Sequence, residues 1–228
     1  MPKLTWDQTG ERLYSTGVSK GVLFPYTEDK YGAGVAWNGL TKVSENPSGA
    51  EPTALWADNG KYLNILSAET FAATISAYMY PDEFKKCIGE EEVVAGMSVG
   101  QQDHQMFGFS YQTIIGNDTK NTKYGYQIHV VYGCTAAASA KDYETVNDSP
   151  SAAEMSFDIS TTPVDVTGFK PTATLLFDST KLSKEQMKAV ETALYGDESA
   201  APKLPTPDEF KALIQAAVSP RITLLTIS

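Results

Sequence analysis

One serine of the chain has catalytic spacing: Gly96-Met97-Ser98-Val99-Gly100 follows the G-x-S-x-G pattern of a nucleophile elbow. That elbow holds its serine on a strained turn between a strand and a helix, where a histidine and an acid activate the hydroxyl. The residues after Gly100 begin an alternating, strand-like pattern instead of a helix. Beyond His104 the sequence offers only His129, on the polar side of an expected strand. We therefore interpret the motif as a glycine-flanked turn.

Metal and cofactor motifs are also missing from the sequence. Two histidines and two cysteines, Cys87 and Cys134, are too few and too widely spaced for a zinc signature or a disulfide framework. Gly32-Ala33-Gly34 opens like a dinucleotide fingerprint, but Trp37 stands where close packing requires glycine or alanine. Pairs of carboxylates exist among the 28 acidic residues without forming a glycosidase pattern. We expect no enzyme, no metal and no cofactor.

The charge balance argues against a protein that grips nucleic acid. The 228 residues carry 18 Lys and Arg against 28 Asp and Glu, a formal net charge of −10. Binding DNA by its phosphates needs clustered basic side chains that displace counterions. No apolar run approaches the roughly 18 residues that span a bilayer, and residues 1–7 lack the apolar stretch of a signal peptide. We expect a soluble, unexported protein with no membrane partner.

Period-two alternation of apolar and polar side chains dominates the middle of the chain and predicts half-buried strands. Such strands are expected over 71–80, 155–159 and 173–177. Segments 107–115 and 124–132 also alternate, and the turn-forming stretch 116–123 between them predicts a long antiparallel hairpin. A parallel sheet would need continuous apolar runs joined by crossover helices. The fold class is therefore mainly β and antiparallel.

Two helices are expected late in the sequence. Ser183 and Gln186 fit a capping box, and Gly196 stands where a helix would end. The apolar stripe between them has helical spacing: Met187, Val190 and Leu194. Thr206-Pro207 is a second start signal, because proline suits the first helical position. Pro220 is expected to end this second, short helix, and 222–227 resembles a terminal strand.

One domain is expected over residues 1–228, with an N-terminal arm at 1–20 and a C-terminal extension at 197–228. Residues 41–60 lack a sustained period and contain two prolines and two glycines, so we expect a long loop. Structureless loops of this length are usually functional. This one contains Leu55 and Trp56, side chains that a solvated loop seldom exposes. The segment 82–100 is a second candidate excursion.

Short blocks in a recognisable order cover residues 6 to about 210: Trp6-Asp7-Gln8-Thr9-Gly10-Glu11-Arg12, Gly17-Val18-Ser19-Lys20-Gly21-Val22-Leu23, Gly34-Val35-Ala36-Trp37-Asn38-Gly39-Leu40, Ala57-Asp58-Asn59-Gly60-Lys61-Tyr62, Tyr80-Pro81-Asp82-Glu83-Phe84, Ile115-Gly116-Asn117-Asp118-Thr119, Tyr132-Gly133-Cys134, Asn147-Asp148-Ser149-Pro150 and Ser160-Thr161-Thr162-Pro163-Val164. Together these blocks resemble the major tail protein family of long-tailed siphophages and related prophages of Gram-positive bacteria. Residues 219–228 match nothing in that pattern.

The resemblance implies a tail-tube subunit, a β-sandwich with a flanking α-helix that forms hexameric rings stacked into a tube. Its implied partners are further copies of itself, a tape-measure protein, and the tail terminator and distal tail proteins. DNA would pass through the lumen during ejection without specific binding. The implied location is the virion tail, assembled in the host bacterial cytoplasm.

Closed rings that also stack along an axis require several distinct contact patches on each subunit. For inter-subunit contacts we expect the exposed apolar side chains Leu55, Trp56, Trp37 and Trp6. For the lumen we expect uncharged polar strand faces, which would neither repel nor hold DNA strongly: Thr74, Ser76, Ser110, Gln112 and Gln127.

Two other functions remain open at the level of sequence. A headless tail-like bacteriocin would use a similar tube subunit. A monomeric β-sandwich could instead bind a carbohydrate or a peptide, with Trp37 and Trp56 as an aromatic platform.

Overall fold

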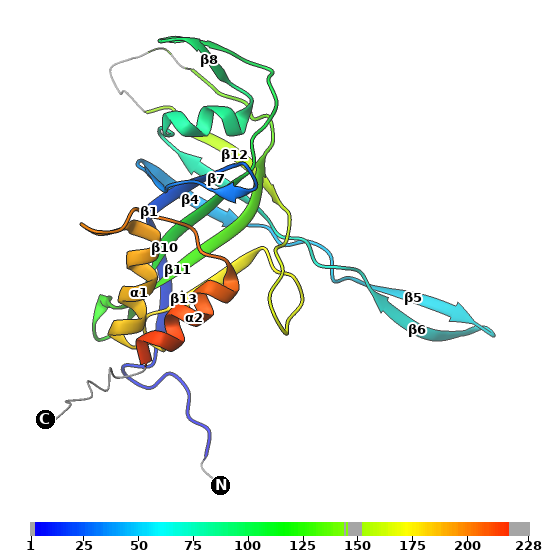
Figure 1. Ribbon diagram of the computed structural model, residues 1–228. Helices are drawn as coiled ribbons and strands as arrows, with labels where there is room; N and C mark the ends of the chain where they lie inside the picture. The colour runs from blue at the N-terminus through cyan, green and yellow to red at the C-terminus, as the bar shows by residue number, and fades with distance from the viewer. Residues whose placement is uncertain (1–2, 144, 146–151, 219–228) are drawn as a thin grey trace, which may run out of the picture.

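The computed structural model describes residues 3–143, 145 and 152–218. Its elements are, in chain order, β1 (Leu13–Thr27), β2 (Lys30–Tyr31), β3 (Val35–Trp37), β4 (Leu40–Glu45), β5 (Pro52–Ala57), β6 (Gly60–Leu66), β7 (Ala72–Ala77), the 3-10 helix η1 (Asp82–Ile88), β8 (Glu91–Val94), β9 (Met97–Val99), β10 (Phe107–Asn117), β11 (Asn121–Ala136), β12 (Met155–Thr161), β13 (Thr174–Asp178), α1 (Lys184–Tyr195) and α2 (Pro207–Val218). The fold is mainly β, and its paired strands are antiparallel (Figure 1).

The main sheet has nine strands, with β2-β1-β10-β11-β12-β7-β4 in spatial order. Two strands lie off this path, because β3 pairs with β1 and β13 pairs with β11. One edge of the long strand β11 pairs with two strands in succession. Gln127 to Val131 pair with β13, and Cys134 to Ala136 pair with β12. The last strand, β4, also contacts β1. The β12-β7-β4 half of the sheet therefore folds back over the β1-β10-β11 half.

An aromatic core fills the space between these two halves. Trp37, Phe84, Phe109 and Phe157 meet there, with the Trp37 and Phe84 ring centroids 4.5 Å apart and those of Phe84 and Phe157 5.1 Å apart. From β7, the predicted alternation places Ala73, Ile75 and Ala77 in this core. Such edge-to-face and tilted aromatic contacts add to the free energy of apolar burial.

A second core lies on the opposite face of β1, β10 and β11, beneath α1 and α2. Ile128, Val130 and Tyr132 of β11 point into it, alternating with residues that face the aromatic core. Gly108 of β10 allows the approach of this layer, since a Cβ atom there would collide with Leu204. The central strands are thus covered on both faces.

The sequence signals of α1 are confirmed in detail. Ser183 Oγ accepts from the Gln186 amide, and Gln186 Oε1 accepts from the Ser183 amide, so the capping box is complete. Gly196 ends the helix with a positive φ of 74°. Pro207 occupies the first position of α2, as predicted. The predicted end at Pro220 and the strand at 222–227 lie outside the described residues.

The three predicted appendages differ from the structure. Residues 13–20 belong to β1 and pair with β10, so the arm is shorter than 1–20. The C-terminal extension packs into the second core, with Leu204 and Phe210 buried and Tyr132 Oη donating to the Pro205 carbonyl at 2.8 Å. The sequence pattern missed the packing of residues 197–206 because irregular segments carry no period, whereas Phe210 lies on the predicted second helix. The 3-10 helix η1 was also missed.

The prediction of a loop over 41–60 is wrong. Residues up to Glu45 form β4, and β5 and β6 pair as a β-hairpin that projects from the body (Figure 1). Asp58 and Asn59 connect the two strands, both with positive φ, as a two-residue hairpin turn requires. Aspartate and asparagine tolerate that backbone conformation well.

The second core should be tested by truncating a side chain of α1. Leu194 is fully buried, so Leu194→Ala should lower the free energy of unfolding by roughly 2–5 kcal/mol. The matched control is Leu176→Ala in β13, whose leucine is 56% exposed and should change stability by about 0.5 kcal/mol or less. Urea denaturation of both variants gives the comparison. Equal stabilities would show that α1 does not depend on this packing.

Candidate functional site

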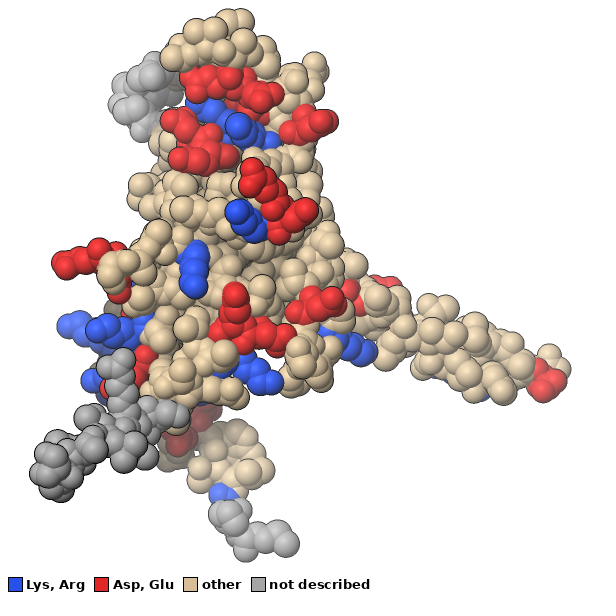
Figure 2. All heavy atoms as spheres, in the orientation of Figure 1, with Lys and Arg blue, Asp and Glu red and all other residues tan. Residues whose placement is uncertain are grey.

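The β5–β6 hairpin carries a cluster of exposed apolar side chains. Its exposed large apolar side chains are Leu55, Trp56, Tyr62, Leu63, Ile65 and Leu66, with Trp56 71% and Tyr62 72% exposed. An isolated two-stranded hairpin is at best marginally stable in water. In Figure 2 the projecting hairpin shows few charged atoms, apart from an acidic group at its tip, where Asp58 lies in the turn. The hairpin therefore has the composition of a segment that packs against something else.

Two of the four predicted contact residues, Leu55 and Trp56, lie on this hairpin. Trp6 is 73% exposed in the N-terminal arm. That arm is tied to the turn after β10: the Gly10 amide donates to the Asp118 carboxylate at 2.9 Å, and Asn117 Nδ2 donates to the Gly10 carbonyl at 3.0 Å. The arm thus leaves the body at a fixed point.

Trp37 cannot contact another subunit. Its side chain is 3% exposed, packs on Phe84 and Phe109, and donates from Nε1 to the Met79 carbonyl at 2.9 Å. The prediction failed because β3 is short and its tryptophan turns into the core. Trp37 and Trp56 consequently do not form a shared aromatic platform, which removes the feature on which the monomeric carbohydrate-binding alternative depended.

The predicted lumen residues fall into separate places. Ser110 is fully buried and Gln112 is 9% exposed, because β10 turns them toward the helix-covered face of the sheet. Gln127 lies on β11 and donates to the Asp178 carboxylate at 3.3 Å. Thr74 and Ser76, on β7, share the face of the other sheet half that points away from the aromatic core. A polar residue on a strand indicates a solvent-facing side of the sheet only where no other element of the fold covers that side.

Around Thr74 and Ser76 the β4-β7-β12 half of the sheet presents a polar surface. Strand register aligns Lys42, Ser76 and Ser156 in one row and Ser44, Thr74 and Asp158 in the next, and we call these six residues the polar sheet face. Thr74 Oγ1 donates to Asp158 Oδ1 at 2.7 Å, and the Ser76 and Ser156 hydroxyls lie 3.5 Å apart. Hydroxyls dominate this face, and its charges are mixed in sign.

A hydrogen-bonded cluster joins the two halves of the sheet at the end of β4. Glu45 Oε1 accepts from Tyr111 Oη at 2.5 Å and contacts His129 Nδ1 at 3.1 Å. Thr113 Oγ1 lies 3.0 Å from His129 Nε2, and the Tyr111 and His129 rings stack 4.6 Å apart. The hydrogen bond from His129 lowers the pKa of Glu45, and burial raises the pKa of Tyr111. The cluster fixes β4 just before the chain leaves for the hairpin.

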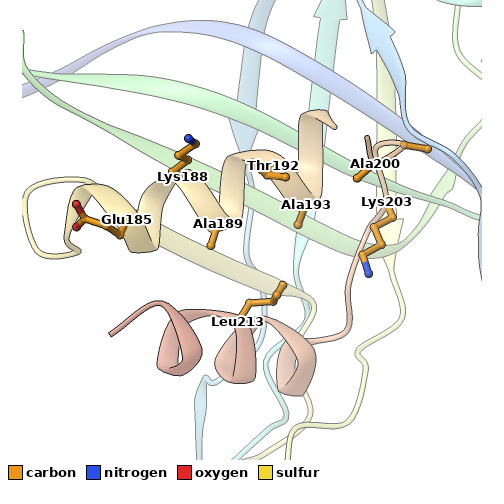
Figure 3. A pocket seen from close by; sticks show the side chains of 9 residues that line it. Glu185, Lys188, Ala189, Thr192, Ala193, Ala200, Lys203 and Leu213 are labelled. Carbon is orange, nitrogen blue, oxygen red and sulfur yellow. The ribbon is translucent and has the colours of Figure 1, made fainter. Parts of the chain in front are cut away.

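A cleft between α1 and α2 forms a concave apolar surface (Figure 3). It encloses about 460 Å³. Ala189 and Ala193 of α1 and Leu213 of α2 point toward each other across it, with Lys188 and Lys203 nearby (Figure 3). Small side chains on one wall leave room for a larger group.

The sequence motifs that could carry chemistry have these positions in the described part of the chain. Gly96 lies in the turn between β8 and β9, where its amide donates to the Glu92 carboxylate, but Met97–Val99 form β9, so Ser98 lies on a strand and the predicted turn is confirmed only at Gly96. Cys87 and Cys134 are buried and unpaired, and burial raises the pKa of Cys87 to about 12. In residues 3–143, 145 and 152–218, no three His, Cys, Asp or Glu side chains are placed to hold a metal ion. The helices of this part of the chain are too short or too polar to cross a membrane.

Comparison with models of known protein families and with curated proteins finds no match to this chain.

The Glu45 cluster should make stability depend on pH. Because the folded-state pKa of Glu45 is lowered, its stabilisation is complete above the unfolded value of about 4.3 and is lost as pH falls through the folded value. Glu45→Gln should lower the free energy of unfolding by about 1 kcal/mol near neutral pH, a modest loss because 44% of the Glu45 side chain is exposed. The difference from wild type should shrink toward about pH 3.

Urea denaturation across this pH range measures the effect. The control is Glu28→Gln, whose carboxylate is 86% exposed. If both variants show the same pH profile, the cluster does not link the sheet halves energetically.

Proposed function

We propose that this protein is a β-sandwich tail-tube subunit that assembles into hexameric rings stacked as a DNA-conducting tube. The resemblance of its sequence blocks to the major tail protein family is one support. The other is the antiparallel sheet folded over itself with helices against one outer face, an architecture compatible with that family. A subunit of this kind would serve equally in a phage tail and in a headless tail-like bacteriocin.

The observation that carries the proposal is the β5–β6 hairpin. Six large apolar side chains stand exposed on an extension that the chain's own body does not cover. Burying each would contribute about 1.5–3 kcal/mol, so the hairpin favours association over a monomeric state. Additional exposed apolar groups at Trp6 in the arm and Val94 and Met97 in the β8–β9 hairpin supply further patches. A ring that also stacks needs several such patches on one subunit.

The polar sheet face suits the wall of a DNA channel. Its hydroxyls hydrogen-bond to water and to each other, and Lys42 and Asp158 oppose each other in sign. DNA passing such a surface would meet few cationic groups at which its phosphates could be held. The net charge of −10 on every subunit adds repulsion that acts only within about 8 Å at physiological ionic strength.

Assembly tests the proposal through the hairpin. Leu55→Ser combined with Trp56→Ser should abolish ring and tube formation, as seen by light scattering during size-exclusion chromatography and by electron microscopy. The melting temperature of the monomer should stay within a few degrees, because surface substitutions away from the core change stability by about 0.5 kcal/mol. Lys61→Ser, in the same hairpin, is the control and should assemble. Normal tubes from the double variant would contradict the proposal.

The polar sheet face is tested by adding charge to it. Ser76→Lys with Ser156→Lys should leave folding and tube assembly intact but slow genome ejection at low salt, with recovery as salt rises, because lysines bind phosphates through counterion release. Ser76→Gln with Ser156→Gln controls for side-chain size. Ejection from virions carrying each variant is measured against salt concentration. Equal ejection by the lysine and glutamine variants would mean that this face does not line the channel.

A further inference from the structure

The β5–β6 hairpin is apolar on both of its faces. The cross-strand pairs Leu55–Leu63 and Thr53–Ile65 place one set of side chains on the first face. On the second face Pro52 pairs with Leu66 and Ala54 with Asn64, and Trp56 pairs with Lys61 after a bulge that leaves the exposed Tyr62 without a cross-strand partner in the register. The exposed fractions are similar on the two faces: 42%, 40% and 53% for Leu55, Leu63 and Ile65, and 71%, 72% and 66% for Trp56, Tyr62 and Leu66.

A single flat contact would satisfy only half of this hairpin. Strand side chains alternate between faces, so a surface that covers Leu63 leaves Tyr62 and Trp56 in water. A hairpin meant for one contact would carry polar residues on its other side, as half-buried antiparallel strands do. Its two apolar faces therefore indicate two covering surfaces.

The exposed apolar area of the hairpin can supply a substantial part of an interface. Six apolar side chains at on the order of 100 Å² each expose roughly 600 Å², most of the about 800 Å² that each partner buries in a stable interface. Two covering surfaces would share this area, about half to each face.

Copies of this chain offer a receiving surface of matching chemistry. The α1–α2 cleft is apolar, with small side chains at Ala189 and Ala193, and Lys188 and Lys203 nearby (Figure 3). The hairpin supplies large apolar side chains and an acidic tip at Asp58. Head-to-tail contacts between identical subunits bring unlike surfaces of this kind together.

We infer that each β5–β6 hairpin is held between two other copies of this chain, one covering each face. The inference rests on the proposed tube assembly and specifies how its subunits interlock: one hairpin joins three molecules. Every hairpin thus lies in a slot that exists only where two neighbours meet, so a subunit can dock its hairpin fully only on an already associated pair.

Photocrosslinking from each face separately tests this arrangement. Benzoylphenylalanine is placed at Leu63 for the first face, at Trp56 for the second, and at both positions in a third variant. Each tagged variant is co-assembled with a large excess of wild-type chain, so that labelled subunits rarely meet, and the pelleted tubes are irradiated. Either single label should give covalent dimers, and the double label should give trimers. Mass spectrometry should place the two crosslinks on different segments of the neighbouring chains.

Two results would overturn the inference while leaving tube assembly standing. One is that both labels crosslink to the same segment, and the other is that the double label yields only dimers although each single label crosslinks. A wild-type chain that forms no tubes or rings would instead contradict the proposed function itself.

Thiol protection supplies a second measurement that needs no bulky label. Leu63→Cys and Tyr62→Cys are neighbours in sequence on opposite faces, and the native Cys87 and Cys134 are buried. Both introduced thiols should react with maleimide at least tenfold more slowly in tubes than in dilute monomer. Protection of only one of them would overturn the inference.

Discussion

The structure depends on the burial of β1, β10 and β11 on both faces. Antiparallel sheets commonly leave one face to water, but here the β12-β7-β4 half covers one side of these strands and the helices cover the other. This double covering also fixes the position of β4, from which the hairpin departs. It also determines which strand faces remain free for any partner.

The free surfaces follow from that arrangement. With α1 and α2 on one side, the outer face of β4, β7 and β12 remains an open sheet surface, and its residues are mostly hydroxylic. The Glu45, Tyr111 and His129 cluster ties the two sheet halves together at the root of the hairpin. The polar sheet face and the projecting apolar hairpin are therefore joined to one frame, as the proposed tube subunit requires.

Sequence reasoning succeeded where a local signal determines local structure. The alternation over 71–80 gave β7, and the Ser183 and Gln186 capping box gave the start of α1, because both depend on neighbouring residues alone. It failed where packing between elements distant in the sequence determines whether a side chain is exposed. Ser110 alternates as an outward residue would, yet helices far along the chain cover it. The two-residue turn at Asp58 and Asn59 was overlooked because prolines and glycines nearby suggested a loop.

The assembled wild-type protein, reconstructed by cryo-electron microscopy, tests the central claim most directly. We predict sixfold rings stacked into a tube, with Thr74 and Ser76 facing the channel and the β5–β6 hairpin buried among neighbouring subunits. A monodisperse monomer at every concentration would contradict it, as would an assembly in which the hairpin stays in solvent.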